Sequence, residues 1–378
     1  MEWKEVRLGD ILNFRRGHDL PHSAMKPGNI PVAGSNGIIG YHDTATPIKP
    51  ILTIGRSGNV GKPYFYEEAW AHNTTLYVDD FKGNDPKFLY YLCQTMPFAN
   101  FGGGSAVPTL NRNHIHPLET KIPVKVEDQR RIASILSSLD RKIELNNKIN
   151  ADLEEMAQAI FKNWFVDFEP FKDGKFVDSE LGMIPEGWKV GRLTDVIKLM
   201  PGGTPKTSEP LYWDNGTIPF FSPKDVNGVY CFATEKHITE AGLNKCSSNL
   251  YPKDTIFITC RGTVGKVCLA ACDMAMNQSN YAIKAIDGYS QYYVFFLVKS
   301  VVERLIKKSN GAVFSAITSK DFDEEILIPS QKAVEDFTNV IDGFFRRIFT
   351  ICTEKSRLSL LRDTLLPRLM SGELEVPE

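Results

Sequence analysis

The stretch GRSGNVGK at residues 55–62 combines glycine and lysine in a way that could bind phosphate. A nucleotide-binding phosphate loop needs four residues between its glycines, followed by Lys and then Ser or Thr. Here five residues separate Gly55 from Gly61, and Pro63 takes the place of the metal-binding hydroxyl. The stretch therefore does not predict a nucleotide site. Its second part recurs, however, as RGTVGK at residues 261–266.

No other set of residues has the spacing of a catalytic centre. The Asp/Asn/Ser-Pro-Pro-Tyr/Phe motif of amino-methylating enzymes is missing, and FGGGS at 101–105 is not their Phe-x-Gly-x-Gly loop. ETK at 119–121 matches the Glu-x-Lys of many nucleases, but no Pro-Asp partner precedes it. His114 and His116 have no companion for a metal, and the seven cysteines include no Cys-x-x-Cys pair. We therefore expect neither a catalytic residue nor a metal ligand.

The bulk properties fit a globular chain of two domains. With 378 residues, 42% hydrophobic and 11% aromatic, the chain is too long for one ordinary core and too apolar for disorder. Because the net charge is −2, a nucleic-acid partner would need locally concentrated basic residues. The cysteine usage is typical of reduced thiols in a cytoplasmic protein, and neither a signal peptide nor a membrane span is expected.

The two halves of the sequence repeat each other. EWKEVRLGDILNFRRG at 2–17 matches GWKVGRLTDVIKLMPG at 187–202, and GGSAVPTLNRNHI at 103–115 parallels SNGAVFSAITSKDF at 309–322. The offset grows along the chain, as loop insertions would make it. The loop residues that this alignment pairs are Arg56 with Arg261 and Asn73 with Asn277. A repeat of roughly 200 residues predicts duplicated domains rather than a solenoid.

Each half has a body of short β-rich runs, such as ILTIGR, TLYV and DTIFIT, interrupted by short helical stretches. We predict the α+β class, with a twisted or barrel-like sheet in each body. Both halves end in a long helical pattern. The expected segments are a first body at 1–125, a long helix at 126–170, a linker at 171–186, a second body at 187–329, and a second long helix with a tail at 330–378.

Apolar residues in the two long helical patterns recur at steps of three and four, the 3.5-residue period of a coiled coil. A run of ~40 residues makes a helix ~60 Å long. Each helix could pack on its own body. We favour the alternative, in which the helices pack on each other, antiparallel, about a pseudo-two-fold axis, with polar seam residues fixing the register. The residues expected in the seam or against a partner protein are Ile132, Leu139, Ile143, Leu153, Ile160, Trp164, Phe344, Ile348, Ile351, Leu358 and Leu365.

Four basic loops without acidic residues occupy equivalent places in the two halves, at 51–63, 102–116, 259–267 and 307–320. Their glycines let the backbone approach a surface closely, and amide, Arg and Lys groups contact phosphates and base edges. A single Gly-rich turn with one Arg or Lys is usually only a turn, but the duplication favours contact with DNA. The residues expected to contact DNA are Arg56, Lys62, Asn73, Arg112, Asn113, Arg261, Lys266, Asn277, Gln278 and Lys320.

Residues 104–170, 179–196, 259–267 and 365–376 resemble, in order, segments of type I restriction-modification specificity subunits. The resemblance spans essentially the whole chain, although the second loop lacks the Pro-x-Leu of VPTLN. It implies two target-recognition domains, each binding one half of a bipartite, asymmetric target in double-stranded DNA. It also implies that the helices set the spacer and dock two methyltransferase subunits, which restriction (motor and nuclease) subunits join. S-adenosylmethionine, ATP and Mg would belong to those partners, and this chain would bind no cofactor and no membrane.

Three alternatives remain open at this point. One is a specificity subunit of a related system whose partner is a fused methyltransferase-nuclease. Another is a small nuclease or methyltransferase, which would differ by binding S-adenosylmethionine as an isolated chain. The last is a coiled-coil scaffold without a role in DNA recognition, which would show no salt-dependent DNA binding.

Overall fold

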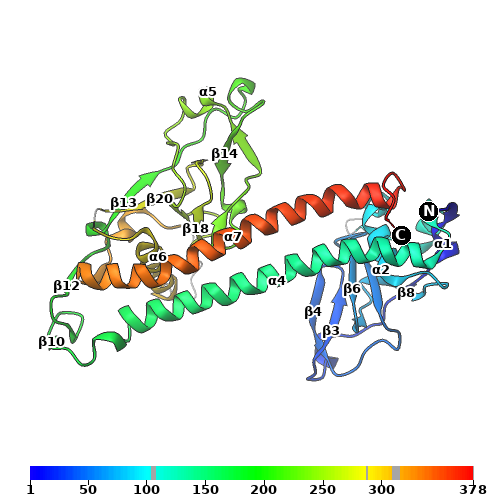
Figure 1. Cartoon of the computed structure of the whole chain (residues 1–378), viewed down its shortest axis with the longest axis horizontal. Coiled ribbons are helices and arrows are strands. Elements are labelled where there is room, and N and C mark those ends of the chain that lie inside the picture. Colours follow the sequence, from blue (N-terminus) through cyan, green and yellow to red (C-terminus); the bar gives the residue numbers. More distant parts are fainter. Residues whose placement is uncertain (104–107, 287, 309–315, 378) are drawn as a thin grey trace. The chain divides into compact units, whose positions relative to one another are not determined.

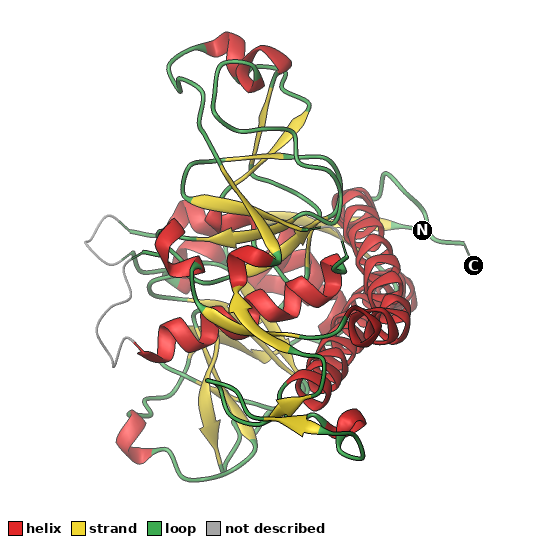
Figure 2. Cartoon of the chain, turned by 90° about the vertical axis from the view of Figure 1, so that its left-hand side faces the viewer, coloured by secondary structure: helices red, strands yellow, loops and turns green. Residues whose placement is uncertain are grey.

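The computed structural model describes residues 1–103, 108–286, 288–308 and 316–377, which fold into two compact units. The first unit contains Met1–Glu144 and Arg357–Glu378, and the second contains Leu145–Ser356. Helices and strands both contribute to the fold, so the chain belongs to the α+β class (Figure 2). Each unit therefore combines a body of strands with one part of each of two long helices, labelled α4 and α7 in Figure 1.

The first unit is built on a four-stranded sheet in the order β2-β8-β5-β6, a three-stranded sheet β4-β3-β7 and the pair β1-β9. Its elements are β1 (Trp3–Arg7), α1 (Leu8–Ile11), β2 (Asn13–Arg16), η1 (His22–Ala24), β3 (Ile30–Gly34), β4 (Gly37–His42), β5 (Ile51–Gly55), β6 (Pro63–Tyr66), β7 (Trp70–Ala71), β8 (Thr75–Asp80), α2 (Pro86–Thr95), η2 (Phe98–Phe101), α3 (Arg112–Ile115), β9 (Glu119–Pro123) and the first part of α4 (Val126–Phe165).

The second unit is built on a five-stranded sheet β13-β20-β17-β18-β15, a three-stranded sheet β16-β14-β19 and the pairs β12-β21 and β10-β11. Its elements after α4 are η3 (Glu169–Phe171), β10 (Phe176–Val177), β11 (Ile184–Pro185), β12 (Lys189–Arg192), η4 (Leu193–Asp195), β13 (Ile197–Pro201), η5 (Pro210–Tyr212), β14 (Ile218–Phe221), η6 (Pro223–Asp225), β15 (Tyr230–Cys231), β16 (Lys236–Ile238), α5 (Glu240–Leu243), β17 (Ile256–Thr259), β18 (Val267–Ala270), β19 (Ala275–Met276), β20 (Asn280–Ala285), α6 (Gln291–Lys308), η7 (Ser319–Phe322), β21 (Glu325–Ile328) and the first part of α7 (Gln331–Met370).

The two units share one topology. The order β2-β8-β5-β6 corresponds to β13-β20-β17-β18, β4-β3-β7 to β16-β14-β19, and β1-β9 to β12-β21. The strand registers agree as well. Arg16 at the end of β2 lies opposite Leu76 in the first unit, and Pro201 at the end of β13 lies opposite Tyr281 in the second. The second unit adds β15 at the edge of its main sheet. The strands thus form several small sheets in each unit, and their shared pairing order is what makes positions in the two units comparable.

The long helices α4 and α7 contact each other through polar side chains where they run through the second unit. Asn146 Nδ2 donates to Glu354 Oε2 at 2.9 Å, and Asn150 Nδ2 donates to Cys352 Sγ at 3.1 Å. Asn146 is 1% exposed, so its amide is buried between the helices. Because residue numbers rise along α4 as they fall along α7, the two helices run in opposite directions within this unit.

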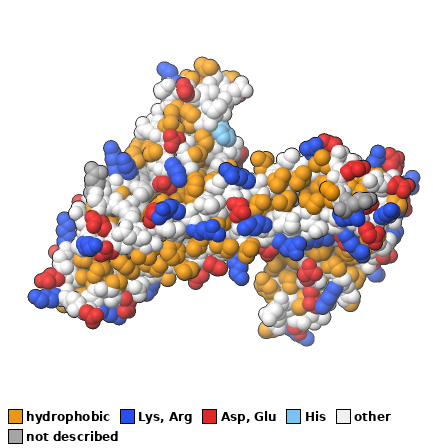
Figure 3. Space-filling model, in the orientation of Figure 1, with side chains coloured by type: hydrophobic (Ala, Val, Ile, Leu, Met, Phe, Trp, Pro, Cys, Tyr) orange, Lys and Arg blue, Asp and Glu red, His pale blue; other side chains and the backbone are white. Residues whose placement is uncertain are grey.

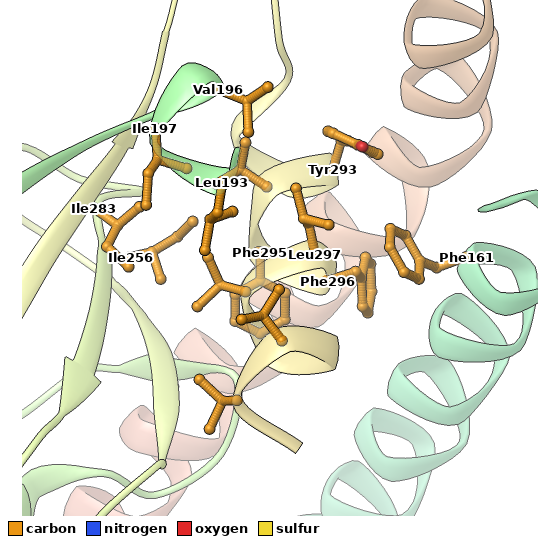
Figure 4. Packing of buried hydrophobic residues seen from close by; sticks show 14 of the residues in the cluster. Phe161, Leu193, Val196, Ile197, Ile256, Ile283, Tyr293, Phe295, Phe296 and Leu297 are labelled. Atoms are coloured by element: carbon orange, nitrogen blue, oxygen red, sulfur yellow. The ribbon is translucent and has the colours of Figure 1, made fainter. Parts of the chain in front are cut away.

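The core of the second unit lies between α4, α6, α7 and the main sheet (Figure 4). Phe161 of α4 lies 5.6 Å from Phe296 of α6, and Phe165 lies 5.0 Å from Phe337 of α7, measured between ring centroids. Phe161 is 3% exposed and Phe296 is 1% exposed. The heptad pattern assigned the inward positions here to Ile160 and Trp164, which are only half-buried. The buried residues are their neighbours Phe161 and Phe165, because α4 faces α6 as well as α7.

The predicted seam residues are all at least half-buried. Those with little exposure are Ile132, Ile348 and Ile351. Those that are half-buried are Leu139, Ile143, Leu153, Ile160, Trp164, Phe344, Leu358 and Leu365. The apolar stripe found in the sequence therefore does face protein along both helices, with the Phe161–Phe165 shift as its local departure. None of the helices in the described ranges is long and apolar enough to cross a membrane.

Candidate nucleic-acid interface

The loop between β5 and β6 in the first unit is closed by two backbone hydrogen bonds. The Gly55 N–H donates to the Lys62 carbonyl at 3.1 Å, and the Gly61 N–H donates to the Gly55 carbonyl at 2.8 Å. Gly58 and Gly61 have φ angles of +83° and +82°, which favour glycine. The loop is therefore a defined turn that holds Arg56 at its entry and Lys62 at its exit.

The loop between β17 and β18 in the second unit has the same construction. The Thr259 N–H donates to the Lys266 carbonyl at 2.9 Å, and the Gly265 N–H donates to the Thr259 carbonyl at 2.8 Å. Gly262 and Gly265 have φ angles of +81° and +85°. Thr259 thus takes the place of Gly55, and Lys266 takes the place of Lys62.

This backbone correspondence corrects the pairing of Arg56 with Arg261. The Arg56 N–H donates to the Thr74 carbonyl at 2.8 Å, and it is the Cys260 N–H that makes the same bond, to Ser279, at 2.9 Å. Arg261 corresponds instead to Ser57. Ser57 forms an isolated β-bridge to Thr109, just before α3, and Arg261 forms one to Ala316, just before η7. Similarity of residue type suggested the wrong pair, whereas the hydrogen bonds fix the equivalent one.

The pairing of Asn73 with Asn277 is wrong by one residue for the same reason. The Thr75 N–H donates to the His72 carbonyl at 2.9 Å, and the Asn280 N–H donates to the Asn277 carbonyl at 3.4 Å. Asn277 therefore corresponds to His72. Gln278 is the equivalent of Asn73, so an amide side chain occupies the same place in both units.

An open hollow of about 440 Å³ lies beside the first loop, and we call it the first hollow. Its charged lining consists of Arg15, Arg16, Arg56 and Arg112, and none of the described residues that line it carries a carboxylate. Arg15 and Arg16 come from β2 and reach Asp79 and Asp19 at 3.5 Å and 3.4 Å, respectively. The four guanidinium groups make the first hollow a concentrated basic site. Sequence reasoning missed Arg15 and Arg16, although the FRRG run held the signal.

The other residues proposed for the first unit lie around this hollow rather than in it. Arg56 Nη1 donates to the Asn73 backbone carbonyl at 3.4 Å, so the Arg56 side chain reaches the Asn73 segment. Arg112 Nη1 donates to the Phe14 carbonyl at 3.2 Å, which positions its guanidinium group. Asn113 is exposed on α3, and Lys62 is exposed with its Nζ 5.4 Å from the Tyr64 ring.

A second open hollow, of about 590 Å³, lies beside the loop of the second unit, and we call it the second hollow. It brings together Arg261, Asn277 and Gln278, all predicted from the sequence. Trp213 and Lys236, which the sequence did not single out, line it too, with Lys236 Nζ 5.6 Å from the Trp213 ring. The second hollow is thus mainly polar and aromatic, with Glu235 as an acidic member.

Lys266 and Lys320 are exposed in the second unit but do not line the second hollow. Parts of the two loops at 103–115 and 309–322 on which the repeat was based, residues 104–107 and 309–315, lie outside the described residues. Basic and acidic side chains are interspersed on the visible face of the molecule, as the net charge of −2 requires (Figure 3). Basic side chains gather at both hollows, four at the first and three, Lys224, Lys236 and Arg261, at the second.

A half-buried histidine, His116, is hydrogen-bonded to β2, the strand that carries Arg15 and Arg16 of the first hollow. His116 Nε2 accepts a hydrogen bond from the Phe14 N–H at 3.1 Å. Burial, together with the positive charges of Arg112 and Lys82, lowers the pKa of His116 below its usual value. The ring is therefore neutral at pH 7, which the accepted hydrogen bond requires. In the described ranges, no three His, Cys, Asp or Glu side chains come together in a way that could hold a metal.

The sequence of the chain is similar to those of one known protein family. The family model described as the type I restriction modification DNA specificity domain matches residues 1–155 and 185–346. The chain is 30% identical to the type I restriction enzyme MjaIX specificity subunit of Methanocaldococcus jannaschii, over 77% of this chain and 70% of that protein. It is 28% identical to the HindI specificity subunit of Haemophilus influenzae, over 98% of this chain and 94% of that protein.

One solved structure has a similar fold. The crystal structure of the type I restriction-modification S subunit from M. genitalium matches with a TM-score of 0.65 at 14% sequence identity, covering 98% of this chain and 96% of that one. The likeness extends over both units and the long helices, so the architecture described above is shared with that protein.

Proposed function

The chain belongs to the family of type I restriction-modification specificity subunits, and on this premise we propose that each unit reads one half of a bipartite, asymmetric DNA target. The observation that carries the proposal is the pair of hollows beside equivalent loops in two units of the same topology. Because their linings differ, the two half-sites should differ in sequence. Recognition by this chain would need no catalytic residue, cofactor or metal of its own.

The side chains at the hollows have the chemistry of base and phosphate recognition. Arg pairs bidentately with the O6 and N7 atoms of guanine, and Asn or Gln with the N6 and N7 atoms of adenine, in the major groove. Arg and Lys also contact phosphates without reading sequence. We assign base reading to Arg56 and Asn73 in the first unit and to Arg261 and Gln278 in the second. Lys62 and Lys266, exposed at the loop exits, are assigned to phosphates.

The long helices would set the distance between the half-sites. Two modules that bind the same face of a duplex lie about one helical turn apart, ~34 Å. Helices of 40 residues, such as α4 and α7, are ~60 Å long and can span that distance. We propose that α4 and α7 form an antiparallel coiled coil about a pseudo-two-fold axis, and that the sheets of each unit form a barrel-like body.

Apolar side chains exposed on the helices would dock two methyltransferase subunits. On α7, Leu360 is 70% exposed and Leu361 is 47% exposed, and on α4 Met156 is 53% exposed. Contiguous exposed apolar patches mark protein–protein contact surfaces, and Leu360 and Leu361 are neighbours on α7. The partners would supply S-adenosylmethionine chemistry, and restriction subunits would add ATP-driven and Mg-dependent activity in the cytoplasm.

The test is to co-express the chain with the methyltransferase encoded beside it and to map modified adenines across a plasmid library. Methylation at one split, asymmetric motif is the expected result. The matched variants Arg56→Ala and Arg261→Ala should each weaken one half of that motif only. A continuous motif, or none despite a stable complex, would contradict the proposal.

A further inference from the structure

The amide side chains of Asn73 and Gln278 occupy equivalent positions but are held by different neighbours. Asn73 Nδ2 donates to Asp19 Oδ1 in the first unit. In the second unit, Thr204 Oγ1 donates to Gln278 Oε1. Both hydrogen bonds join the loop after the first strand of the main sheet to the turn before its central strand.

Asp19 and Thr204 are themselves equivalent. The residue before Asp19, His18, donates its N–H to the Ala71 carbonyl at 2.8 Å. The residue before Thr204, Gly203, donates its N–H to the Met276 carbonyl at 3.0 Å. The registers of β2 and β13 already make Arg16 and Pro201 equivalent. The residues that follow therefore correspond one to one, up to Asp19 and Thr204. The pairs Asp19–Asn73 and Thr204–Gln278 are therefore equivalent hydrogen-bonded pairs, formed by different side chains.

In the first unit the partner fixes the amide with its NH₂ end toward Asp19, which leaves the oxygen at the other end. An ionised carboxylate can only accept hydrogen bonds, so the NH₂ end of Asn73 must face Asp19. Arg16 Nη2 also lies 3.4 Å from Asp19 Oδ1, on the same carboxylate oxygen. Within the described residues, no protein group donates to Asn73 Oδ1. The first unit thus presents a hydrogen-bond acceptor at this position.

In the second unit the amide has the other orientation, beside a hydroxyl that donates to it here but can also accept. The Thr204 hydroxyl occupies the oxygen of Gln278, and no described acceptor takes its Nε2 hydrogens. Asn277 Oδ1 is already engaged by the Ser279 N–H at 3.0 Å and by Asn280 Nδ2 at 2.6 Å. Gln278 is exposed and lines the second hollow. The second unit therefore presents a hydrogen-bond donor where the first presents an acceptor.

Building on the proposed function, we propose that Asp19 and Thr204 are positioning residues that set the polarity of base reading in the two half-sites. The acceptor on Asn73 selects a base with an exocyclic amino group in the major groove, adenine N6 or cytosine N4. The donor on Gln278 selects a base with an acceptor there: guanine O6 or N7, adenine N7 or thymine O4. One base pair in each half-site is assigned to this hydrogen-bonded pair.

A structural role alone does not explain these contacts. The Asp19 side chain is 72% exposed, and Gln278 is exposed as well. Neither hydrogen bond lies in a hydrophobic core, so losing it should not unfold its unit. Both hydrogen bonds are exposed, so a molecule that binds there can meet the amides that they orient.

The experiment uses the full chain assembled with its methyltransferase and a target library randomised at each half-site position. Asp19→Asn keeps the size of the side chain but can accept or donate, so it no longer imposes one amide orientation. Discrimination at one base pair of the first half-site should fall about tenfold, with the second half-site unchanged. Thr204→Asp should turn the Gln278 amide and move the preference at one base pair of the second half-site toward adenine N6 or cytosine N4. Thr204→Ser, which keeps the hydroxyl, should retain the wild-type profile.

Uniform changes would overturn the inference. If Asp19→Asn and Thr204→Asp alter affinity for every library member by one factor, with unchanged base profiles, the residues act on phosphates or on folding. Thermal unfolding of each variant, compared with wild type, identifies a folding defect. A wild-type complex that selects no split motif would instead overturn the proposed function itself, which is a different outcome from a split motif insensitive to both variants.

Discussion

Arg362 of α7 and Asp140 of α4 form an ion pair inside the first unit, with Arg362 Nη1 2.9 Å from Asp140 Oδ1. The hydroxyl of Tyr91, on α2, donates to the other carboxylate oxygen at 2.6 Å. Burial and this hydrogen bond raise the pKa of Tyr91, so its hydroxyl stays protonated and donating. A single carboxylate therefore ties both long helices to the body of the first unit.

Arg362→Ala should lower the free energy of unfolding of the first unit by about 1 kcal/mol, because the pair is 28% and 29% exposed and only partly screened. Urea denaturation of the full chain measures the change. Arg357→Ala, an exposed arginine of the same helix, is the matched control and should shift it by less than about 0.5 kcal/mol. Equal effects of the two variants would show that the pair with Asp140 stabilises nothing.

The first half-site should be bound with the steeper salt dependence. The four arginines of the first hollow correspond to positions without charge in the second unit, Met200, Pro201, Cys260 and Ser319. Each phosphate contact adds about 0.9 to the slope of log K against log salt. Arg15→Ala and Arg16→Ala should each lower that slope by up to about one, measured on the assembled complex with the second half-site scrambled. The same substitution at Arg130, on α4 and outside the hollow, should leave the slope unchanged. A slope that all three variants share with wild type would contradict the assignment.

The sequence predicted the elements with strong local signals. The long helices expected within 126–170 and 330–378 are α4 (Val126–Phe165) and α7 (Gln331–Met370), because a period sustained over 40 residues is hard to mistake. The duplicated loops were found because their Gly-Lys framework is dictated by local backbone geometry, with Gly61 and Gly265 both in the left-handed region.

Relationships that depend on long-range pairing could not be predicted from the sequence. Arg56 was matched with Arg261 because both are arginines, but the partner strand decides that Cys260 is the equivalent residue. Arg15 and Arg16 were overlooked for a similar reason, since only the sheet brings β2 beside Arg56. The device formed by Asp19 and Asn73 joins residues 54 positions apart and left no local signal.

Gly61 and Gly262 have nearly identical φ angles, so alanine at each position separates the cost of the left-handed backbone from the cost of a steric clash. Gly61→Ala would place a Cβ 2.6 Å from Phe98 Cβ and 3.0 Å from the Ala99 nitrogen, whereas a Cβ at Gly262 would meet no described atom within 4 Å. Gly262→Ala should therefore cost only the left-handed penalty, about 1–2 kcal/mol. Gly61→Ala should cost that penalty plus the clash, about 3 kcal/mol or more in total. Thermal unfolding of each variant checks the order, and equal losses would mean that the loop around Gly61 relaxes freely.

The stability of the first unit should fall as the pH is lowered below about 6.5, and His116 should account for part of the fall. Burial, with Arg112 and Lys82 nearby, lowers the pKa of His116 from its ordinary value of 6.5, so the unfolded chain takes up the proton at a higher pH than the folded chain does. The stability supported by neutral His116 is complete above the unfolded pKa and is lost as the pH falls through it. Protonation also converts Nε2 from the acceptor of the Phe14 N–H into a donor, which breaks that hydrogen bond. His116→Gln keeps an acceptor without titrating, and urea denaturation at pH 7.5 and pH 5.5 should show a smaller difference for it than for wild type. Burial also lowers the pKa of His72, so His72→Gln should reduce the difference further. If the pH dependence is the same in the wild type and both variants, neither histidine controls it.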